Sequence, residues 1–315
     1  MSPAYVARRV FLALLTLWGV TIVAFALVRA LPGDAVAALL QDYAYASNVD
    51  EMRHTLGLDR PVTVQYVDWL GNVLRGDLGS SLRSKTPIAD ELKNRVPVTL
   101  ELGLLGMVIG ALIAIPVGVV SAVRQHSLSD YFSRGLAIAM LAIPSFWIAT
   151  LVVTLPSIWF KWTPSLFYTR FTADPMKNLG IVIIPAVILG IGLSGTLMRL
   201  TRAQMLDVLR QDYVRTARAK GLPSTLVVVR HALRNALIPI VTLLGLQISI
   251  LIGGSVVLEQ IFVLPGMGRY LLEAIQYRDY PVIQALNLLF AAAIIGSNLV
   301  VDLAYGWLDP RVRHA

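Results

Sequence analysis

Residues 102–123 read LGLLGMVIGALIAIPVGVVSAV, an apolar stretch without one charged side chain. A helix of about 20 such residues is long enough to cross the hydrocarbon core of a bilayer. The whole chain has a similar bias, since 56% of its 315 residues are hydrophobic and only 15% are charged. Soluble domains contain roughly 45–50% apolar and about 25% charged residues. The sequence therefore predicts an all-α polytopic membrane protein.

Five further stretches are comparably long and free of charge, so we expect six transmembrane helices. The predicted spans are residues 10–28, 102–123, 135–160, 178–198, 236–258 and 281–301. Arg8 and Arg9 precede the first span, as in a secretory signal peptide. Its apolar core exceeds the usual length of roughly 7–15 residues, however, and no A-x-A-like cleavage site follows. We therefore expect this span to be a retained helix.

Basic residues in the short loops predict which helix ends face the cytoplasm. With a cytoplasmic N-terminus, fourteen basic residues fall inside: Arg8, Arg9, Arg124, Arg134, Arg199, Arg202, Arg210, Arg215, Arg218, Lys220, Arg230, Arg234, Arg311 and Arg313. Five fall in short outside loops: Lys161, Arg170, Lys177, Arg269 and Arg278. The predicted cytoplasmic segments are then residues 1–9, 124–134, 199–235 and 302–315, and the periplasmic segments are 29–101, 161–177 and 259–280.

The periplasmic segment 29–101 is long and mixed in charge. Turn signals occur at Pro32-Gly33-Asp34, Gly57, Gly76-Asp77 and Gly79. Residues 53–58 and 64–74 are predicted to be helical, and Tyr66 and Trp69 suit the membrane interface. Ordered connections of this length usually have a role, so a docking surface and a passive connector both stay open.

No catalytic, metal or cofactor site is expected in this chain. It has no cysteine, and its four histidines, His54, His126, His231 and His314, are far apart in sequence. The G-x-S-x-G, H-E-x-x-H and G-x-x-x-x-G-K-[ST] patterns are absent from the sequence. The net charge of +8 follows from the basic cytoplasmic loops, so no nucleic-acid partner is expected.

The predicted spans contain polar but no ionisable side chains, so the usual signature of ion-driven transport is missing. Asp302 comes closest, at the end of the last span, where it could reach headgroups or pair with an arginine. The polar residues that could line a pathway, or hydrogen-bond between helices, are Gln247, Ser249, Ser255, Gln284, Asn287, Ser297 and Asn298. The sequence does not separate these two roles.

The cytoplasmic segment 199–235 has the pattern of two helices joined by a glycine turn. Met205, Leu206, Leu209, Ala217 and Ala219 suit a helix that Gly221 ends. Pro223 suits the start of a second helix. Such a rigid projection could carry the displacement of a docked partner to the spans. The alternative is a solvated basic loop.

The sequence Arg215-Thr-Ala-Arg-Ala-Lys-Gly221, followed by His231-Ala-Leu-Arg-Asn235 and Pro239, resembles the EAA loop of binding-protein-dependent ABC importer permeases. The dipeptide, oligopeptide and nickel branch is the most similar. Further segments with this likeness are residues 32–34, 56–61, 76–82, 265–268, 278–281 and 309–311. The chain departs from the general pattern at Arg215-Thr216, where glutamate-alanine is usual, and at Leu233-Arg234, where leucine-proline is usual.

The resemblance implies a type I ABC importer permease in the bacterial inner membrane. Its expected partners are a second, homologous permease, two cytoplasmic ATPases that bind ATP and Mg, and a periplasmic or lipid-anchored solute-binding protein. By the same resemblance, the residues that contact the ATPase are Arg215, Thr216, Ala217, Arg218, Ala219, Lys220, Gly221 and Leu222.

Short peptides are the expected substrate by this resemblance, with a nickel chelate, glutathione or another small solute as alternatives. A secondary transporter would need ions at mid-membrane or an inverted repeat. An intramembrane enzyme would need a nucleophile and a base facing each other. These two classes stay as the alternatives to an importer permease.

Overall fold

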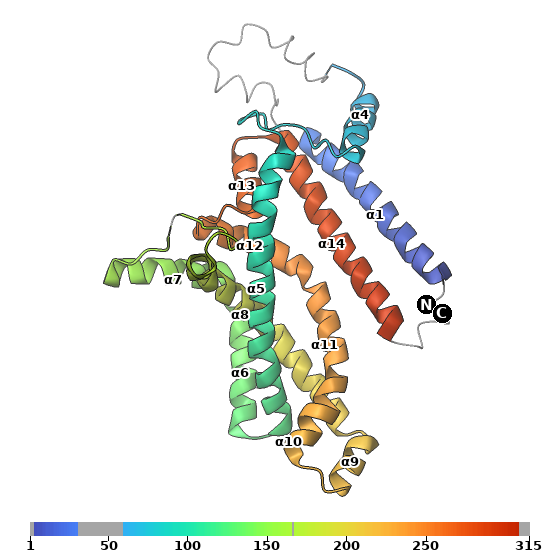
Figure 1. Ribbon diagram of the computed structural model, residues 1–315, viewed down its shortest axis with the longest axis vertical. Helices are drawn as coiled ribbons and strands as arrows, with labels where there is room; N and C mark the ends of the chain where they lie inside the picture. The colour runs from blue at the N-terminus through green and yellow to red at the C-terminus, as the bar shows by residue number, and fades with distance from the viewer. Residues whose placement is uncertain (1–2, 31–58, 166, 309–315) are drawn as a thin grey trace. The chain divides into compact units, whose positions relative to one another are not determined.

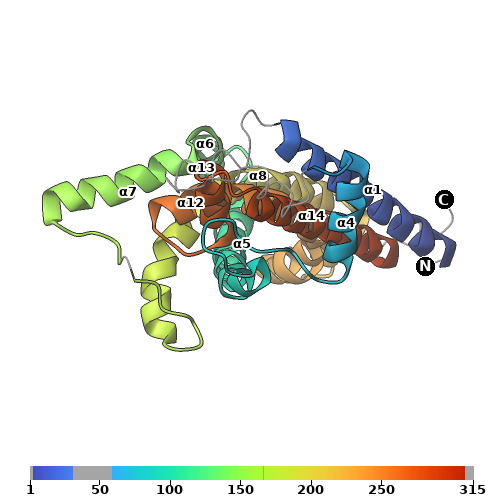
Figure 2. The same ribbon diagram turned by 90° about the horizontal axis from the view of Figure 1, so that it is seen from above.

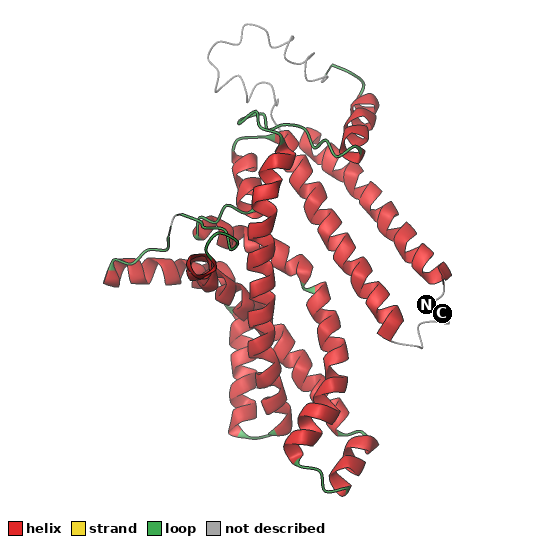
Figure 3. Ribbon diagram, in the orientation of Figure 1, coloured by secondary structure: helices red, strands yellow, loops and turns green. Residues whose placement is uncertain are grey.

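The structure is a computed structural model that describes residues 3–30, 59–165 and 167–308. Within these ranges the regular elements are helices, apart from one isolated bridge between Ser80 and Pro87 (Figure 3). The expected all-α fold is therefore confirmed. The predicted helix at 53–58, the segment 32–34, His54 and the C-terminal residues 309–315 lie outside the described residues.

The chain divides into two compact units, Met1–Pro97 with Pro265–Ala315, and Val98–Leu264. The first unit contains α1 (Pro3–Ala30), α4 (Val62–Leu74), the first turns of α5 (Ile88–Val123), α13 (Met267–Gln276) and α14 (Tyr280–Leu308). Helices α1 and α14 lie side by side (Figure 1), and an ion pair of 2.9 Å joins Arg9 Nη1 to Asp302 Oδ2. Asp302 thus pairs with an arginine, which is one of the two roles that the sequence predicts for it.

Helix α4 confirms the predicted helix at 64–74 and packs on α1 through aromatic side chains (Figure 2). The Phe25 ring centroid is 5.2 Å from that of Tyr66 and 5.7 Å from that of Trp69. The hydroxyls of Tyr66 and Thr21 share a hydrogen bond of 2.7 Å. The aromatic contacts and this hydrogen bond together hold α4 against α1, the first predicted span.

The second unit contains the rest of α5 and eight further helical segments. These are α6 (Leu128–Ala142), α7 (Ser145–Phe160), α8 (Pro175–Leu209), α9 (Asp212–Ala219), α10 (Ser224–Leu226), the π-helix η1 (Val227–Leu233), α11 (Arg234–Leu246) and α12 (Ile248–Ile261). Helix α8 lies at the centre, in contact with α6, α7, α11 and α12. Its buried face includes Val182, Ala186 and Leu189.

Five described helices are long and apolar enough to cross a membrane, and a bent pair makes a sixth candidate span. The predicted span 135–160 is therefore not one continuous helix, because the chain breaks between the two helices of this pair. Helices α6 and α7 meet at an angle of 87°, and Figures 1 and 2 both show the bend. The break falls at Pro144, whose backbone is extended, with φ −63° and ψ 136°. Proline has no N–H to continue the helical hydrogen bonds, so α6 ends before it and α7 begins after it.

The predicted fifth span, 236–258, is also corrected. Helix α11 ends at Leu246, and the candidate span is Ser224–Leu246, which begins inside the predicted cytoplasmic segment. The remaining apolar residues form the separate helix α12. Hydropathy alone cannot locate this boundary, because α11 and α12 are both apolar.

Two other helices extend well past their predicted spans. Helix α5 begins at Ile88 rather than at 102, and α8 continues to Leu209 rather than to 198. The charged residues of the α5 extension are compatible with a helix because they pair along it, as Arg95 and Glu91 do at 3.0 Å. A search for uncharged stretches therefore finds the membrane core but not the helix ends.

Glycines let α5 and α8 approach closely. A methyl carbon at Gly190 would lie 2.8 Å from the carbonyl oxygen of Gly106 and 3.0 Å from the amide nitrogen of Gly110. Gly106 and Gly110 have the four-residue spacing by which small residues bring membrane helices together. By contrast, nothing lies within 4 Å of such a carbon at Gly192, two residues farther along α8.

These two glycines predict opposite effects for the same substitution. We expect Gly190→Ala to destabilise the chain by about 1–3 kcal/mol, because the helices must separate. Gly192→Ala should stabilise it by about 0.5–1 kcal/mol, because alanine loses less backbone entropy in a helix. Denaturant titration of the purified chain in detergent measures both. Equal effects of the two substitutions would contradict the close contact at Gly190.

Candidate functional site

The turn after α9 has the geometry that its sequence predicts. Gly221 has a φ of +76°, a conformation that glycine adopts at little cost. Its N–H donates to the carbonyl of Arg218 at 2.9 Å, and that of Leu222 donates to Ala217 at 3.4 Å. This pair of bonds defines a Schellman motif. The prediction that Gly221 ends one helix and Pro223 precedes the next is confirmed.

The helix before this turn is shorter than the sequence pattern predicts. Helix α8 ends at Leu209, and α9 begins only at Asp212, so one continuous helix from Met205 to Ala219 is wrong. Gln211 interrupts it in an extended conformation, with φ −69° and ψ 147°. Helix α9 is therefore a separate short element, which Figure 1 shows beside α10 at the end of α8 and α11.

Helix α9 is anchored by a small apolar core. Val214 and Val227 are fully buried, and Ala217 is 7% exposed. The partly buried side chains of Leu222, Val208 and Leu209 pack against them. The leucine after the glycine covers the helix end, which is the apolar contact that accompanies a Schellman motif. A force on α9 therefore acts on a packed element rather than on a flexible loop.

The eight residues predicted to contact a partner divide between this core and the surface. Ala217 is buried in the core and Leu222 is half-buried. The exposed ones are Arg215, Thr216, Arg218, Ala219, Lys220 and Gly221. The turn thus presents a mostly basic surface with two small residues, Ala219 and Gly221, near its tip.

Hydrogen bonds tie α9 to the segments η1 and α11. The Asn235 Nδ2 donates to the Tyr213 hydroxyl at 2.7 Å and to the His231 carbonyl at 3.1 Å. The Tyr213 hydroxyl donates to the same carbonyl at 3.3 Å. A π-helical turn frees backbone groups from the α-helical pattern and is frequent at functional sites. The sequence motif contains His231 and Asn235 without assigning them a role, and nothing in the sequence pattern singles out Tyr213.

A buried ion pair holds α8 to the first turn of α6. Arg202 Nε and Nη2 donate to the two carboxylate oxygens of Asp130 at 2.8 and 2.9 Å. Ser121 Oγ and the His126 backbone N–H also donate to Asp130, at 2.6 and 3.0 Å. The Asp130 side chain is 1% exposed. The sequence does not distinguish Arg202 from the other basic residues of the predicted cytoplasmic segments. The one sequence feature that could have indicated this ion pair is Asp130, the single acidic residue in the basic segment 124–134.

In the first unit, one carboxylate joins two segments that carry the family resemblance. Ser81 Oγ donates to Asp279 Oδ2 at 2.5 Å, and the Leu82 N–H donates to Asp279 Oδ1 at 3.1 Å. The Arg83 guanidinium lies 3.4 Å from the Tyr277 ring centroid. Burial and the Asp279 charge raise the pKa of Tyr270 to about 12. Residues 76–82 and 278–281 therefore form one structured surface.

One fully buried and one partly buried glutamate lie just outside the predicted spans of the second unit. Thr99 donates to Glu259 at 2.8 Å, and Glu259 is fully buried. Glu101 Oε2 accepts from the Tyr168 hydroxyl at 2.8 Å and from Asn178 Nδ2 at 3.2 Å. Burial, and then this bond to Glu101, raise the pKa of Tyr168 above its usual value. The bonds of Glu101 attach α5 to α8 and to the loop before it, and the bond of Glu259 attaches α5 to α12.

The polar residues proposed for a pathway are divided between the two units of the chain. Gln247, Ser249 and Ser255 belong to the second unit, where Gln247 and Ser255 are buried. The others, Gln284, Asn287, Ser297 and Asn298, lie on α14 of the first unit, and their exposure ranges from buried to exposed. The role of this set therefore stays a prediction. In the described part of the chain, no three His, Cys, Asp or Glu residues are placed to hold a metal ion.

Comparison with known proteins covers nearly the whole chain. The model of the binding-protein-dependent transport system inner membrane component matches residues 114–314, and that of its N-terminal part matches residues 3–103. A putative peptide transport system permease of Brucella melitensis is 42% identical over 314 residues, which is 100% of both chains. The dipeptide transport system permease of Escherichia coli K12 is 38% identical, and the di/tripeptide permease of Pseudomonas aeruginosa is 40% identical, covering 98% and 99% of both chains.

Among solved structures, an amino acid ABC transporter with histidines is similar, with a TM-score of 0.50. The match covers 77% of this chain and 98% of the other, at 15% identity. At that identity the likeness concerns the fold alone. It confirms the predicted membrane-permease architecture.

Proposed function

This chain belongs to the family of binding-protein-dependent transport system inner membrane components, and we propose that it forms half of the pathway of a short-peptide importer. The family places it in the inner membrane, in agreement with its five to six candidate spans. The names of the full-length relatives support a di- or tripeptide as the substrate. A nickel chelate, glutathione or another small solute is the alternative cargo.

In this proposal the chain is the conduit, and partner subunits provide the energy. Two cytoplasmic ATPases bind and hydrolyse ATP with Mg, since this chain has no phosphate-binding loop of the G-x-x-x-x-G-K-[ST] type. A second, homologous permease completes the pathway. A solute-binding protein delivers the peptide to the outer surface, which includes the Asp279 junction with residues 81–83.

The observation that carries the coupling role is the rigid turn at Gly221. Its exposed tip suits a groove of an ATPase, while the core of Val214, Ala217 and Val227 keeps α9 in place. Tyr213 and Asn235 connect α9 to α11, and packing connects it to α8. Movement of the docked ATPase is thereby passed to two candidate spans. ATP favours one arrangement of the spans because the ATPases bind that arrangement more tightly.

Cross-linking from a single introduced cysteine tests the docking. The chain has no cysteine of its own, so one thiol reports on one position. We expect Ala219→Cys, carrying a thiol-attached photo-crosslinker, to capture an ATPase subunit in the assembled complex. Ala217→Cys is the matched control, because Ala217 is 7% exposed and should label poorly.

A second control uses the exposed Ser84, which the loop charges place on the opposite side of the membrane. Ser84→Cys should capture no ATPase. If Ala219→Cys captures no ATPase either, or if Ala219→Cys and Ser84→Cys capture it equally, the proposed docking surface is wrong.

A further inference from the structure

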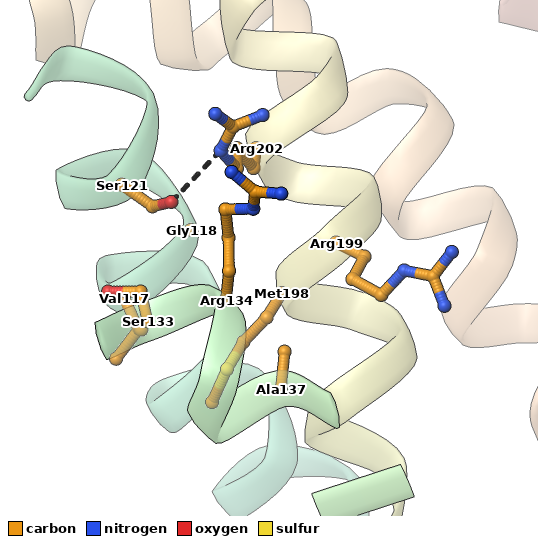
Figure 4. Close-up of a pocket in the computed structure, with 9 residues that line it drawn as sticks. All are labelled: Val117, Gly118, Ser121, Ser133, Arg134, Ala137, Met198, Arg199 and Arg202. Carbon is orange, nitrogen blue, oxygen red and sulfur yellow. Dashed lines mark hydrogen bonds between the residues drawn. The ribbon is translucent and has the colours of Figure 1, made fainter. Parts of the chain in front are cut away.

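We propose that a pocket between α5, α6 and α8 binds the phosphate group of an anionic phospholipid. The pocket has a volume of about 20 Å³ and is shown in Figure 4. Its lining includes the apolar side chains of Val117, Ala137 and Met198 and three arginines, Arg134, Arg199 and Arg202. This space holds about one water-sized group. One phosphate oxygen can enter it, whereas a peptide cannot.

The charge around this pocket favours an anion. Three guanidinium groups line it, and Asp130 neutralises the charge of one of them by binding Arg202, so two positive charges remain uncompensated. Neither Arg134 nor Arg199 has an ion-pair partner among the described residues. Like charges near an apolar medium repel more strongly than in water, and a bound phosphate would offset this repulsion.

The arginines also differ in how far their positions are fixed. Arg202 is held by both oxygens of Asp130 and by Ser121 Oγ, to which its Nε is 3.1 Å distant. In Figure 4 the Arg134 guanidinium points toward the same end of the pocket as that of Arg202, and Arg199 extends away from them. The Arg202 side chain is thus held in one position, whereas the side chains of Arg134 and Arg199 can reorient to bind a phosphate. The planar guanidinium suits phosphate recognition.

The surroundings favour a lipid over free phosphate. Val117, Ala137 and Met198 give the pocket an apolar lining beside its arginines. Tyr131 and Ile138 lie one helical turn on either side of Arg134 along α6, and their side chains are 56% and 62% exposed. An acyl chain can lie along these side chains while its headgroup reaches the arginines. Free phosphate would gain nothing from the apolar groups.

The pocket also lies where a headgroup is expected. It is formed at the end of α5 and the beginning of α6, two of the candidate membrane-crossing segments. The ring centroid of Tyr131 lies 5.9 Å from the Arg134 guanidinium. Tyrosine is one of the aromatic residues that are enriched at membrane interfaces. The loop charges predict that this end is cytoplasmic, and that leaflet carries anionic lipids.

Lipid titration of the purified full-length chain in detergent tests the proposal, with bound lipid counted by native mass spectrometry. We expect phosphatidylglycerol to bind and to raise the unfolding temperature, while phosphatidylcholine and inorganic phosphate do neither at the same concentrations. The double variant Arg134→Gln/Arg199→Gln should bind phosphatidylglycerol at least about tenfold more weakly, because it loses two charge-assisted contacts. Arg134→Lys/Arg199→Lys should retain most of the affinity, because both charges remain.

The matched control is Arg210→Gln/Arg230→Gln, which removes two exposed basic charges outside the pocket. It should bind phosphatidylglycerol as the wild type does. Equal binding of phosphatidylcholine, or an equal effect of inorganic phosphate, would overturn the claim for an anionic lipid. Unchanged affinity in Arg134→Gln/Arg199→Gln, or an equal loss in the control, would overturn the assignment to this pocket.

Discussion

Replacing Gly221 by valine is expected to lower peptide uptake by the assembled importer at least about tenfold, while the chain still folds in the membrane. Gly221 has a φ of +76°, a region that costs an L-residue roughly 1–2 kcal/mol and a β-branched residue more. A cost of about 1.4 kcal/mol is a tenfold change in an equilibrium. The turn is therefore expected to leave its present conformation, displacing Leu222 from the core under α9.

Uptake of a labelled dipeptide into proteoliposomes measures this effect, with the detergent-extracted amount of chain as the check on folding. The matched control is Gly221→Asn, since asparagine enters the left-handed region more readily than other residues. It should retain most of the uptake. If the valine variant transports normally, the turn conformation is not needed for coupling. If the asparagine variant loses as much uptake as the valine variant, transport requires the absence of a side chain at position 221 and not the left-handed backbone conformation.

The second large effect is expected from Asp130→Asn, which should lower the free energy of unfolding by about 3–5 kcal/mol. The substitution keeps the shape of the side chain but leaves Arg202, 22% exposed, without its buried counter-charge. Removing one partner of a buried pair is costly because the remaining charge is desolvated and uncompensated. Denaturant titration of the purified chain in detergent gives the size of the effect.

Asp212→Asn provides the control for Asp130→Asn. Asp212 also pairs with an arginine, Arg215, at 3.3 Å, but its side chain is 95% exposed. Pairs of that kind contribute little to stability. The unfolding midpoint of Asp212→Asn should equal that of the wild type. Equal behaviour of the two variants would show that the Asp130 pair does not fix α8 to the first turn of α6.

The sequence predicts the membrane class and most of the helices, because uncharged stretches of this length are typical of membrane spans. It does not predict where those helices end. The α5 extension from Ile88 carries charges that pair along the helix, and hydropathy excludes it. The 87° bend at Pro144 lies within one apolar stretch, and a proline in such a stretch can either kink a helix or end it.

The turn at Gly221 could be predicted because glycine and proline each restrict the backbone in a known way. The side chains that support it could not. Val214 resembles any other apolar residue until its burial is known. Asp130 and Arg202 are 72 residues apart, and no local spacing relates them. Contacts of this kind depend on how the helices pack, which one sequence does not specify.

The most direct test of the importer function is ATP-dependent uptake of a labelled dipeptide by proteoliposomes that contain this chain, its partner permease, two ATPases and the binding protein. We expect uptake only when the ATPases, hydrolysable ATP and the binding protein are all present, with Gly221→Val at least about tenfold slower than the wild type. Equal uptake by this chain without ATPases, driven by an ion gradient, would contradict the importer function and identify a secondary transporter.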